Sequence, residues 1–149
     1  AILGAVYTAF LFGQARGRDL WQSTVLSAVH MLVHAVMAGS VAMMVIAPET
    51  SAWMANVLLW GIILNLCIIA KEILMPHDTP DTRKAIHLMT KGYYSKYFWA
   101  GIVFGSITPI VMINTYADTM TLIAGGMALV GIFLTEFVRI RVPQMIPLS

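Results

Sequence analysis

Four long apolar stretches constrain this chain more than any other feature of its sequence. They cover residues 25–47, 52–75, 97–114 and 119–138. An α-helix rises 1.5 Å per residue, so about 20 residues cross a hydrocarbon core about 30 Å thick. Each stretch therefore predicts a membrane-spanning helix.

The composition agrees with a membrane environment. Hydrophobic residues make up 59% of the 149 residues and charged ones 11%, against about 25% charged in an ordinary soluble domain. A soluble domain of this size must cover much of its surface with polar residues, which are too few here. We predict an all-α integral membrane protein, and the short connections PETS and TYAD predict an antiparallel transmembrane helix bundle.

The expected domain organisation follows from these lengths. Residues 1–14 are apolar but reach only about 21 Å, so we interpret them as part of a transmembrane helix with a truncated start. Residues 15–24 form a turn, residues 25–138 a four-helix transmembrane bundle, and residues 139–149 a tail. We expect this chain to be the C-terminal part of a longer protein.

All Lys and Arg residues fall on one side when successive connections are assigned to alternate sides of the membrane. The other side receives only Glu49 and Asp118 as charged residues. The positive-inside rule makes the cationic side cytoplasmic, and with it the turn and the tail. The cations are Arg16, Arg18, Lys71, Arg83, Lys84, Lys91, Lys96, Arg139 and Arg141.

The one long connection predicts a cytoplasmic amphipathic segment at about residues 76–96. Pro76 and Pro80 interrupt the chain, and a short helix capped by Asp81 or Thr82 runs to Thr90. A helix lying on the cytoplasmic leaflet fits this pattern, and so does a docking surface for a cytoplasmic partner.

Inserting an ionisable side chain at membrane depth costs at least ~2.5 kcal/mol of free energy, so each such residue is expected to have a structural or functional role. His30 and His34 lie one turn apart on the same face of their helix. They can hydrogen-bond to neighbouring helices or relay protons. They do not fit haem, because two haem ligands approach from opposite sides of the ring. Asn65, near the centre of its span, either joins helices by hydrogen bonds or holds water.

Glu136 and Arg139 are three residues apart, so an ion pair along one helix is available. The pair either ends the helix at the headgroups or places a buried carboxylate at the inner mouth of a proton path. We interpret Lys71 and Glu72 as structural residues at the cytoplasmic interface. Cys67 is the only cysteine, which excludes a disulfide scaffold or a thiolate cluster within the chain.

Small residues predict close helix packing in the second half of the chain. Gly101 and Gly105 form a GxxxG pattern, and Gly125, Gly126 and Gly131 follow in the last span. Pro109 is expected to kink its helix. No phosphate-binding glycine loop, nucleophile elbow or HExxH motif is present.

One segment is similar to a recurring stretch of the NrfD/PsrC family, the membrane subunits of polysulfide-reductase-like complexes. It reads YTAFLFGQARGRDLWQSTVLSAVHMLVHAVMAG, and the matching groups are Tyr7-Thr8-Ala9, Trp21-Gln22-Ser23 and Ala38-Gly39. The family usually has Gly where Ala9 stands. The resemblance implies an eight-helix fold, of which this chain holds the second four-helix bundle plus part of the preceding helix.

The resemblance also implies a function. The chain would be the membrane-anchor, quinone-interacting subunit of a respiratory oxidoreductase complex in the bacterial inner (cytoplasmic) membrane. It would exchange electrons between menaquinone or ubiquinone and an iron–sulfur (ferredoxin-like) subunit, which serves a molybdenum enzyme or a multihaem cytochrome, as in alternative complex III. The family subunit usually carries no metal or haem itself, and neither a catalytic residue nor a nucleic-acid partner is expected here.

Site residues follow from the resemblance and from the polar positions together. Tyr7 is a possible quinone contact, and an interfacial tyrosine without a chemical role fits equally. The proton-path candidates are His30, His34, Asn65, Glu136 and Arg139. The alternative functions are a secondary transporter or channel fragment, which would favour a broken helix pair with polar groups at the midplane, and an assembly scaffold.

Overall fold

The computed structural model describes residues 4, 7, 24–74, 80–115 and 120–145. Within these ranges the chain is helical and contains no strand. The elements are α2 (Thr24–Ile46), the 3-10 turn η2 (Pro48–Thr50), α3 (Ser51–Leu74), α4 (Pro80–Thr90), α5 (Ser95–Ile102), the π-helical segment η3 (Val103–Ile107), α6 (Thr108–Thr115) and α7 (Thr121–Gln144).

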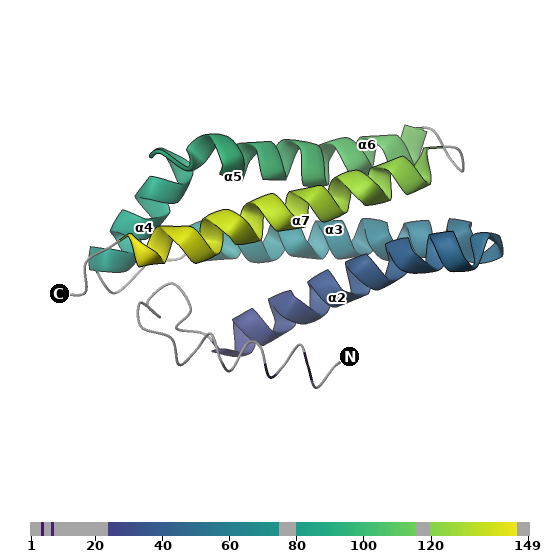
Figure 1. Cartoon of the computed structure of the whole chain (residues 1–149), viewed down its shortest axis with the longest axis horizontal. Helices are drawn as coiled ribbons and strands as arrows, with labels where there is room; N and C mark the ends of the chain where they lie inside the picture. The colour runs from purple at the N-terminus through teal and green to yellow at the C-terminus, as the bar shows by residue number, and fades with distance from the viewer. Residues whose placement is uncertain (1–3, 5–6, 8–23, 75–79, 116–119, 146–149) are drawn as a thin grey trace.

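Four antiparallel rods form the bundle (Figure 1). The rods are α2, α3, the continuous α5–η3–α6 element, and α7, and each is long and apolar enough to cross a membrane. The four expected spans are therefore confirmed. The last rod, α7, continues to Gln144. From the sequence, its end was expected at residue 138, with a tail beyond it. The expected partial helix and turn at residues 1–24 lie almost wholly outside the described residues.

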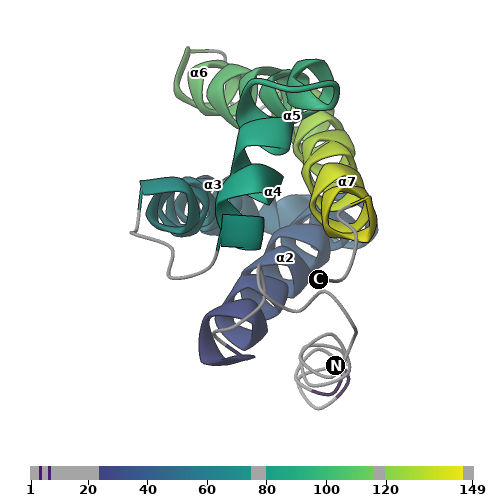
Figure 2. The same ribbon diagram turned by 90° about the vertical axis from the view of Figure 1, so that its left-hand side faces the viewer.

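The rods surround a common centre when the bundle is seen end on, and α4 crosses the near end (Figure 2). One apolar core fills the space between α2, α3 and α7, around the fully buried Met37, Leu58 and Ile62. A second core lies at the end that carries α4. Its buried members are Ile69, Ala85, Met89, Phe98, Ile102, Val138 and Val142.

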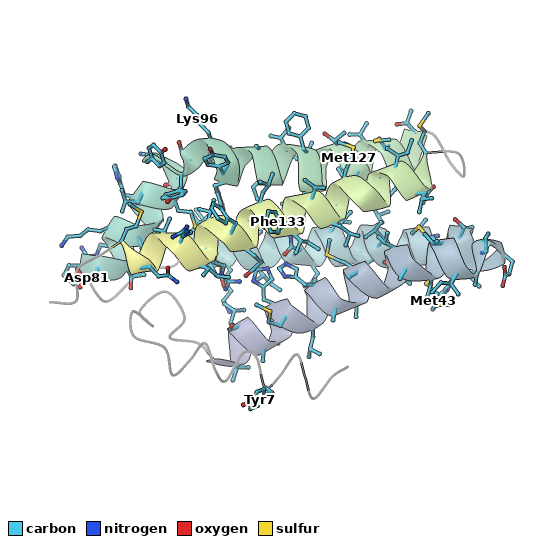
Figure 3. All side chains as sticks on the ribbon, viewed as in Figure 1. Tyr7, Met43, Asp81, Lys96, Met127 and Phe133 are labelled. Atoms are coloured by element: carbon cyan, nitrogen blue, oxygen red, sulfur yellow. The ribbon has the colours of Figure 1, made fainter. Side chains whose placement is uncertain are left out.

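Helix α4 packs against the bundle through one face. Thr82, Ala85 and Met89 are buried, at the three- and four-residue spacing that places them on the same face. Arg83 and Lys84 are exposed. The described cations sit at this end of the bundle, and Figure 3 shows Asp81 and Lys96 there, with Met43 at the opposite end. We refer to the two as the cationic end and the far end.

The third rod contains one π-helical turn, at Val103–Ile107, directly before Pro109. Thr108 donates both its backbone N–H and its hydroxyl to the carbonyl of Val103, the latter at 3.0 Å. A proline has no N–H and crowds the carbonyl four residues earlier. The wider turn accommodates Pro109, so the irregularity that the sequence analysis expected as a kink takes the form of a π-bulge.

Candidate functional site: a buried ionisable cluster

His30 and His34 point from α2 towards a single residue of α3. His30 Nε2 lies 2.7 Å from Asn65 Oδ1, and His34 Nε2 lies 3.0 Å from the same oxygen. The ring centroids are 4.3 Å apart, and His30 is only 1% exposed. One amide oxygen thus joins both imidazoles across the interface between α2 and α3.

Arg139 enters the same space from α7 and is 5% exposed. Its Nη2 donates to Glu72 on α3, and its Nη1 contacts His30 Nδ1. Nη1 also donates to Glu136 Oε1 at 3.2 Å. The same Oε1 lies 3.8 Å from His34 Nδ1, while Glu72 Oε1 lies 4.0 Å from His30 Nδ1.

We call these six residues the polar cluster: His30, His34, Asn65, Glu72, Glu136 and Arg139. Three helices contribute to it, so no local sequence element can form it alone. An ion buried in an apolar bundle costs several kcal/mol unless a partner compensates it. The guanidinium of Arg139 supplies that partner to both carboxylates, which explains how three formal charges are accommodated inside the bundle.

The polar cluster lies in the cationic half of the bundle. His30 is about 9 Å along α2 from its first residue, and Asn65 is about 14 Å from the end of α3, at 1.5 Å per residue. Beyond it towards the far end, Met37, Leu58 and Ile62 close the core. The described buried side chains in that far half are apolar or carry a hydroxyl, and none is ionisable.

Five of the six candidate residues from the sequence therefore come together, and the expected ion pair between Glu136 and Arg139 is present at 3.2 Å. Arg139 is inside the bundle, although the sequence analysis counted it among the cations of the membrane surface. Tyr7, the sixth candidate, is 64% exposed and lies on the outside of the bundle (Figure 3). The structure does not bring it to the cluster.

Glu72 is the member that sequence reasoning missed, because its place beside Lys71 at the end of a span suggested an interfacial role. The sequence does contain a signal that Glu72 lies near the other cluster residues. Glu72 follows Asn65 by seven residues, which is close to two helical turns and places both on one face of α3.

His30, His34 and Glu136 each offer an atom that can bind a metal, and these atoms lie within 4.8 Å of one another. Arg139 Nη1, however, already contacts His30 and Glu136. A permanent cation among the ligands repels a metal ion, and the guanidinium uses the lone pairs that a metal would need. The donor set fits an internal arginine salt bridge better than a metal ion.

Glu136 also borders the outside of the bundle. A groove of about 280 Å³ runs along α7 at the cationic end, and we call it the α7 groove. The two ring centroids of Phe133 and Phe137 are 6.4 Å apart in its wall, and the Arg141 guanidinium lies 5.9 Å from the Phe137 centroid. The groove is lined by Phe133, Glu136, Phe137, Ile140, Arg141 and Gln144.

A larger apolar groove of about 590 Å³ lies between α2 and α3. Its lining includes Trp53, Asn56, Trp60 and Gly61. The Asn56 side chain donates to the carbonyl of Ala52 in its own helix at 2.9 Å. This groove contains no ionisable side chain among its lining residues, which separates it from the polar cluster.

Fold and cluster together define a multi-pass helical membrane protein with an ionisable network inside its bundle. The family model described as polysulphide reductase, NrfD, matches residues 1–147, and the chain belongs to this family. Membership implies a membrane subunit of a respiratory oxidoreductase. No curated protein and no solved structure matches the chain. The family resemblance in the sequence analysis is confirmed.

Proposed function

We propose that this chain forms the quinone-interacting membrane part of a bacterial inner-membrane oxidoreductase, bound to an iron–sulfur subunit. That subunit passes electrons to or from a molybdenum enzyme or a multihaem cytochrome. Family membership and the four spans support the proposal. Electrons move between quinone and the iron–sulfur partner, and the chain holds both in place.

The polar cluster gives the chain its second role, which is to exchange protons with the cytoplasmic side. The observation that carries this proposal is the contact of one buried arginine with both Glu72 and Glu136. With both carboxylates ionised and both histidines neutral, the cluster has one negative charge in excess. One added proton makes it neutral, and a neutral cluster is the cheaper state in an apolar bundle. The cluster is therefore suited to bind and release one proton.

The position of the cluster limits the path that it can serve. Protons reach it from the cationic end, because Glu72 and Arg139 lie near the ends of α3 and α7. The core around Met37, Leu58 and Ile62 separates it from the far end. We propose a half-path from the cytoplasm into the membrane, which accompanies quinone chemistry and is not a continuous channel through these four helices.

Purification of the native protein with its neighbours tests this function. We expect iron–sulfur and molybdenum or multihaem subunits in the same complex, and reduction or oxidation of a quinone analogue by that complex. A protein that purifies alone, shows no quinone reaction and moves a solute across proteoliposomes would contradict the proposal and favour the transporter alternative.

A further inference from the structure

The two histidines of the polar cluster are chemically different, although they occupy one face of one helix. The difference follows from Arg139, because a guanidinium donates hydrogen bonds and accepts none. Its Nη1 contacts His30 Nδ1, so that nitrogen must be the acceptor. The ring proton of neutral His30 is therefore on Nε2.

The orientation of Asn65 follows from this assignment. His30 Nε2–H donates to an atom 2.7 Å away, which must be the carbonyl oxygen Oδ1. A reversed amide would require the His30 proton on Nδ1, where it would face the N–H of Arg139, donor against donor. His34 Nε2 is 3.0 Å from the same oxygen and must also donate. Both rings carry a proton on Nε2.

The Nδ1 atoms of the two rings then meet different neighbours. His30 Nδ1 accepts from Arg139, and taking up a proton there would break that bond. His34 Nδ1 lies 3.8 Å from Glu136 Oε1. A neutral imidazole nitrogen and an ionised carboxylate oxygen are both acceptors, so the two side chains can bond each other only when they share a proton, and the 3.8 Å gap must then shorten.

A second observation identifies Glu136 as the carboxylate with spare capacity. Its Oε2 is buried and has no hydrogen-bond partner among the described residues. Glu136 also lines the α7 groove, which opens to the outside of the bundle. Glu72 likewise accepts a hydrogen bond from Arg139, through Nη2, but none of its oxygens is both buried and without a partner among the described residues.

We propose that His34 and Glu136 form the pair that takes up the proton exchanged by the cluster, entering along the α7 groove, while His30 stays neutral as a positioning residue. The inference rests on the proposed proton exchange and assigns it to two side chains. A hydronium ion in the groove gives its proton to the Glu136 carboxylate and leaves as water. Once the two side chains close the 3.8 Å gap, the carboxylic O–H donates to His34 Nδ1, and transfer of its proton to that nitrogen gives an imidazolium beside a carboxylate. The charge of the pair is the same in both forms.

The charged and titratable groups that face this pair come from all three helices. They are His30 from α2, Glu72 from α3, and Arg139 and Arg141 from α7.

Glutamine separates the roles of the two histidines. Its amide has N–H donors and a carbonyl acceptor, so it can replace the N–H that neutral His30 donates to Asn65 and the nitrogen that accepts from Arg139. In the intact complex we expect His30→Ala to impair proton uptake and His30→Gln to restore it. We expect His34→Ala and His34→Gln to lose it alike, because neither side chain can take a proton. Restoration by glutamine at position 34, and not at position 30, would overturn the assignment.

Infrared spectroscopy of the purified complex tests the same pair without turnover. A carboxylic acid band, sensitive to exchange into D₂O, is expected to appear as the pH is lowered. Glu136→Gln should remove it and His34→Gln should shift it. Glu72→Gln should move its appearance to lower pH, because the cluster is then already neutral with Glu136 ionised. Retention of the band in Glu136→Gln would contradict the proposal.

The infrared test can also be applied to variants that do not turn over quinone. It distinguishes failure of the proposed function from failure of the assignment to His34 and Glu136. If the wild-type complex shows no proton uptake during quinone turnover, the proposed function fails, whatever the band assignment. If uptake occurs but the band belongs to Glu72, the proposed function stands and the pairing of His34 with Glu136 is wrong.

Discussion

Gly105 in the π-helical segment packs directly against Gly131 in α7, backbone on backbone. A Cβ added to either glycine would overlap the Cα of the other. Gly101, one turn earlier, faces the carbonyl of Gly131 and the side chain of Thr135 in the same way. This contact fixes the position of α7, on which Glu136 and Arg139 reach the polar cluster.

Gly131→Ala is therefore expected to destabilise the bundle by about 1–3 kcal/mol, the usual cost of overpacking. The matched control is Gly126→Ala on the same helix, where an added Cβ meets nothing within 4 Å. The control should be neutral or slightly stabilising, because alanine favours helix more than glycine. Thermal unfolding of the purified complex in detergent measures both, and equal midpoints would contradict the packing.

Asn65→Leu is expected to destabilise the protein by about 1–3 kcal/mol for each imidazole N–H that loses its acceptor. Asn56→Leu provides the control, because Asn56 is exposed and its side chain donates to Ala52 of its own helix. The same unfolding measurement applies. A loss of stability at position 56 as large as that at position 65 would show that the shared acceptor does not matter.

Removal of the central cation should have the largest effect on stability. Arg139→Gln leaves two carboxylates without their shared partner, and breaking a buried ion pair costs about 3–5 kcal/mol. Arg141→Gln, two residues along and exposed, should cost much less. The double variant Arg139→Gln with Glu72→Gln should be more stable than the sum of the single changes predicts, because one uncompensated charge is gone. Strict additivity would contradict the ion pair.

Tyr7 remains a predicted quinone contact, carried only by the family resemblance. Tyr7→Phe removes the phenolic O–H and keeps the ring, so quinol turnover should fall while stability does not change. Tyr93→Phe is a suitable control, since Tyr93 is also exposed and belongs to the turn before α5 at the cationic end. Unchanged kinetics in Tyr7→Phe would remove this residue from the quinone site.

The sequence predicted the spans and five of the six residues of the polar cluster for clear physical reasons. Runs of apolar residues determine which segments enter a bilayer, and residues close along one helix, such as His30 with His34 or Glu136 with Arg139, reveal their shared face through spacing alone. The family match covers residues 1–147, so the resemblance noted in one segment holds for nearly the whole chain.

The rest depends on packing between helices, which spacing does not encode. Spacing predicts the pairing of Arg139 with Glu136, but only the packing of three helices brings Glu72 and His30 to its guanidinium and holds it inside the bundle. The π-bulge is similar: Pro109 predicts an irregular turn, but that this turn is π-helical and lies at Val103–Ile107 is seen only in the structure.

Proton uptake in proteoliposomes that contain the complete complex is the most direct test of the central claim, that the polar cluster exchanges protons with the cationic side. The measurement compares protons taken up per quinone turned over in wild type, Glu136→Gln and Glu49→Gln, whose side chain is exposed at the far end. We expect Glu136→Gln alone to lower that ratio. An unchanged ratio in Glu136→Gln, with electron transfer intact, would contradict the account.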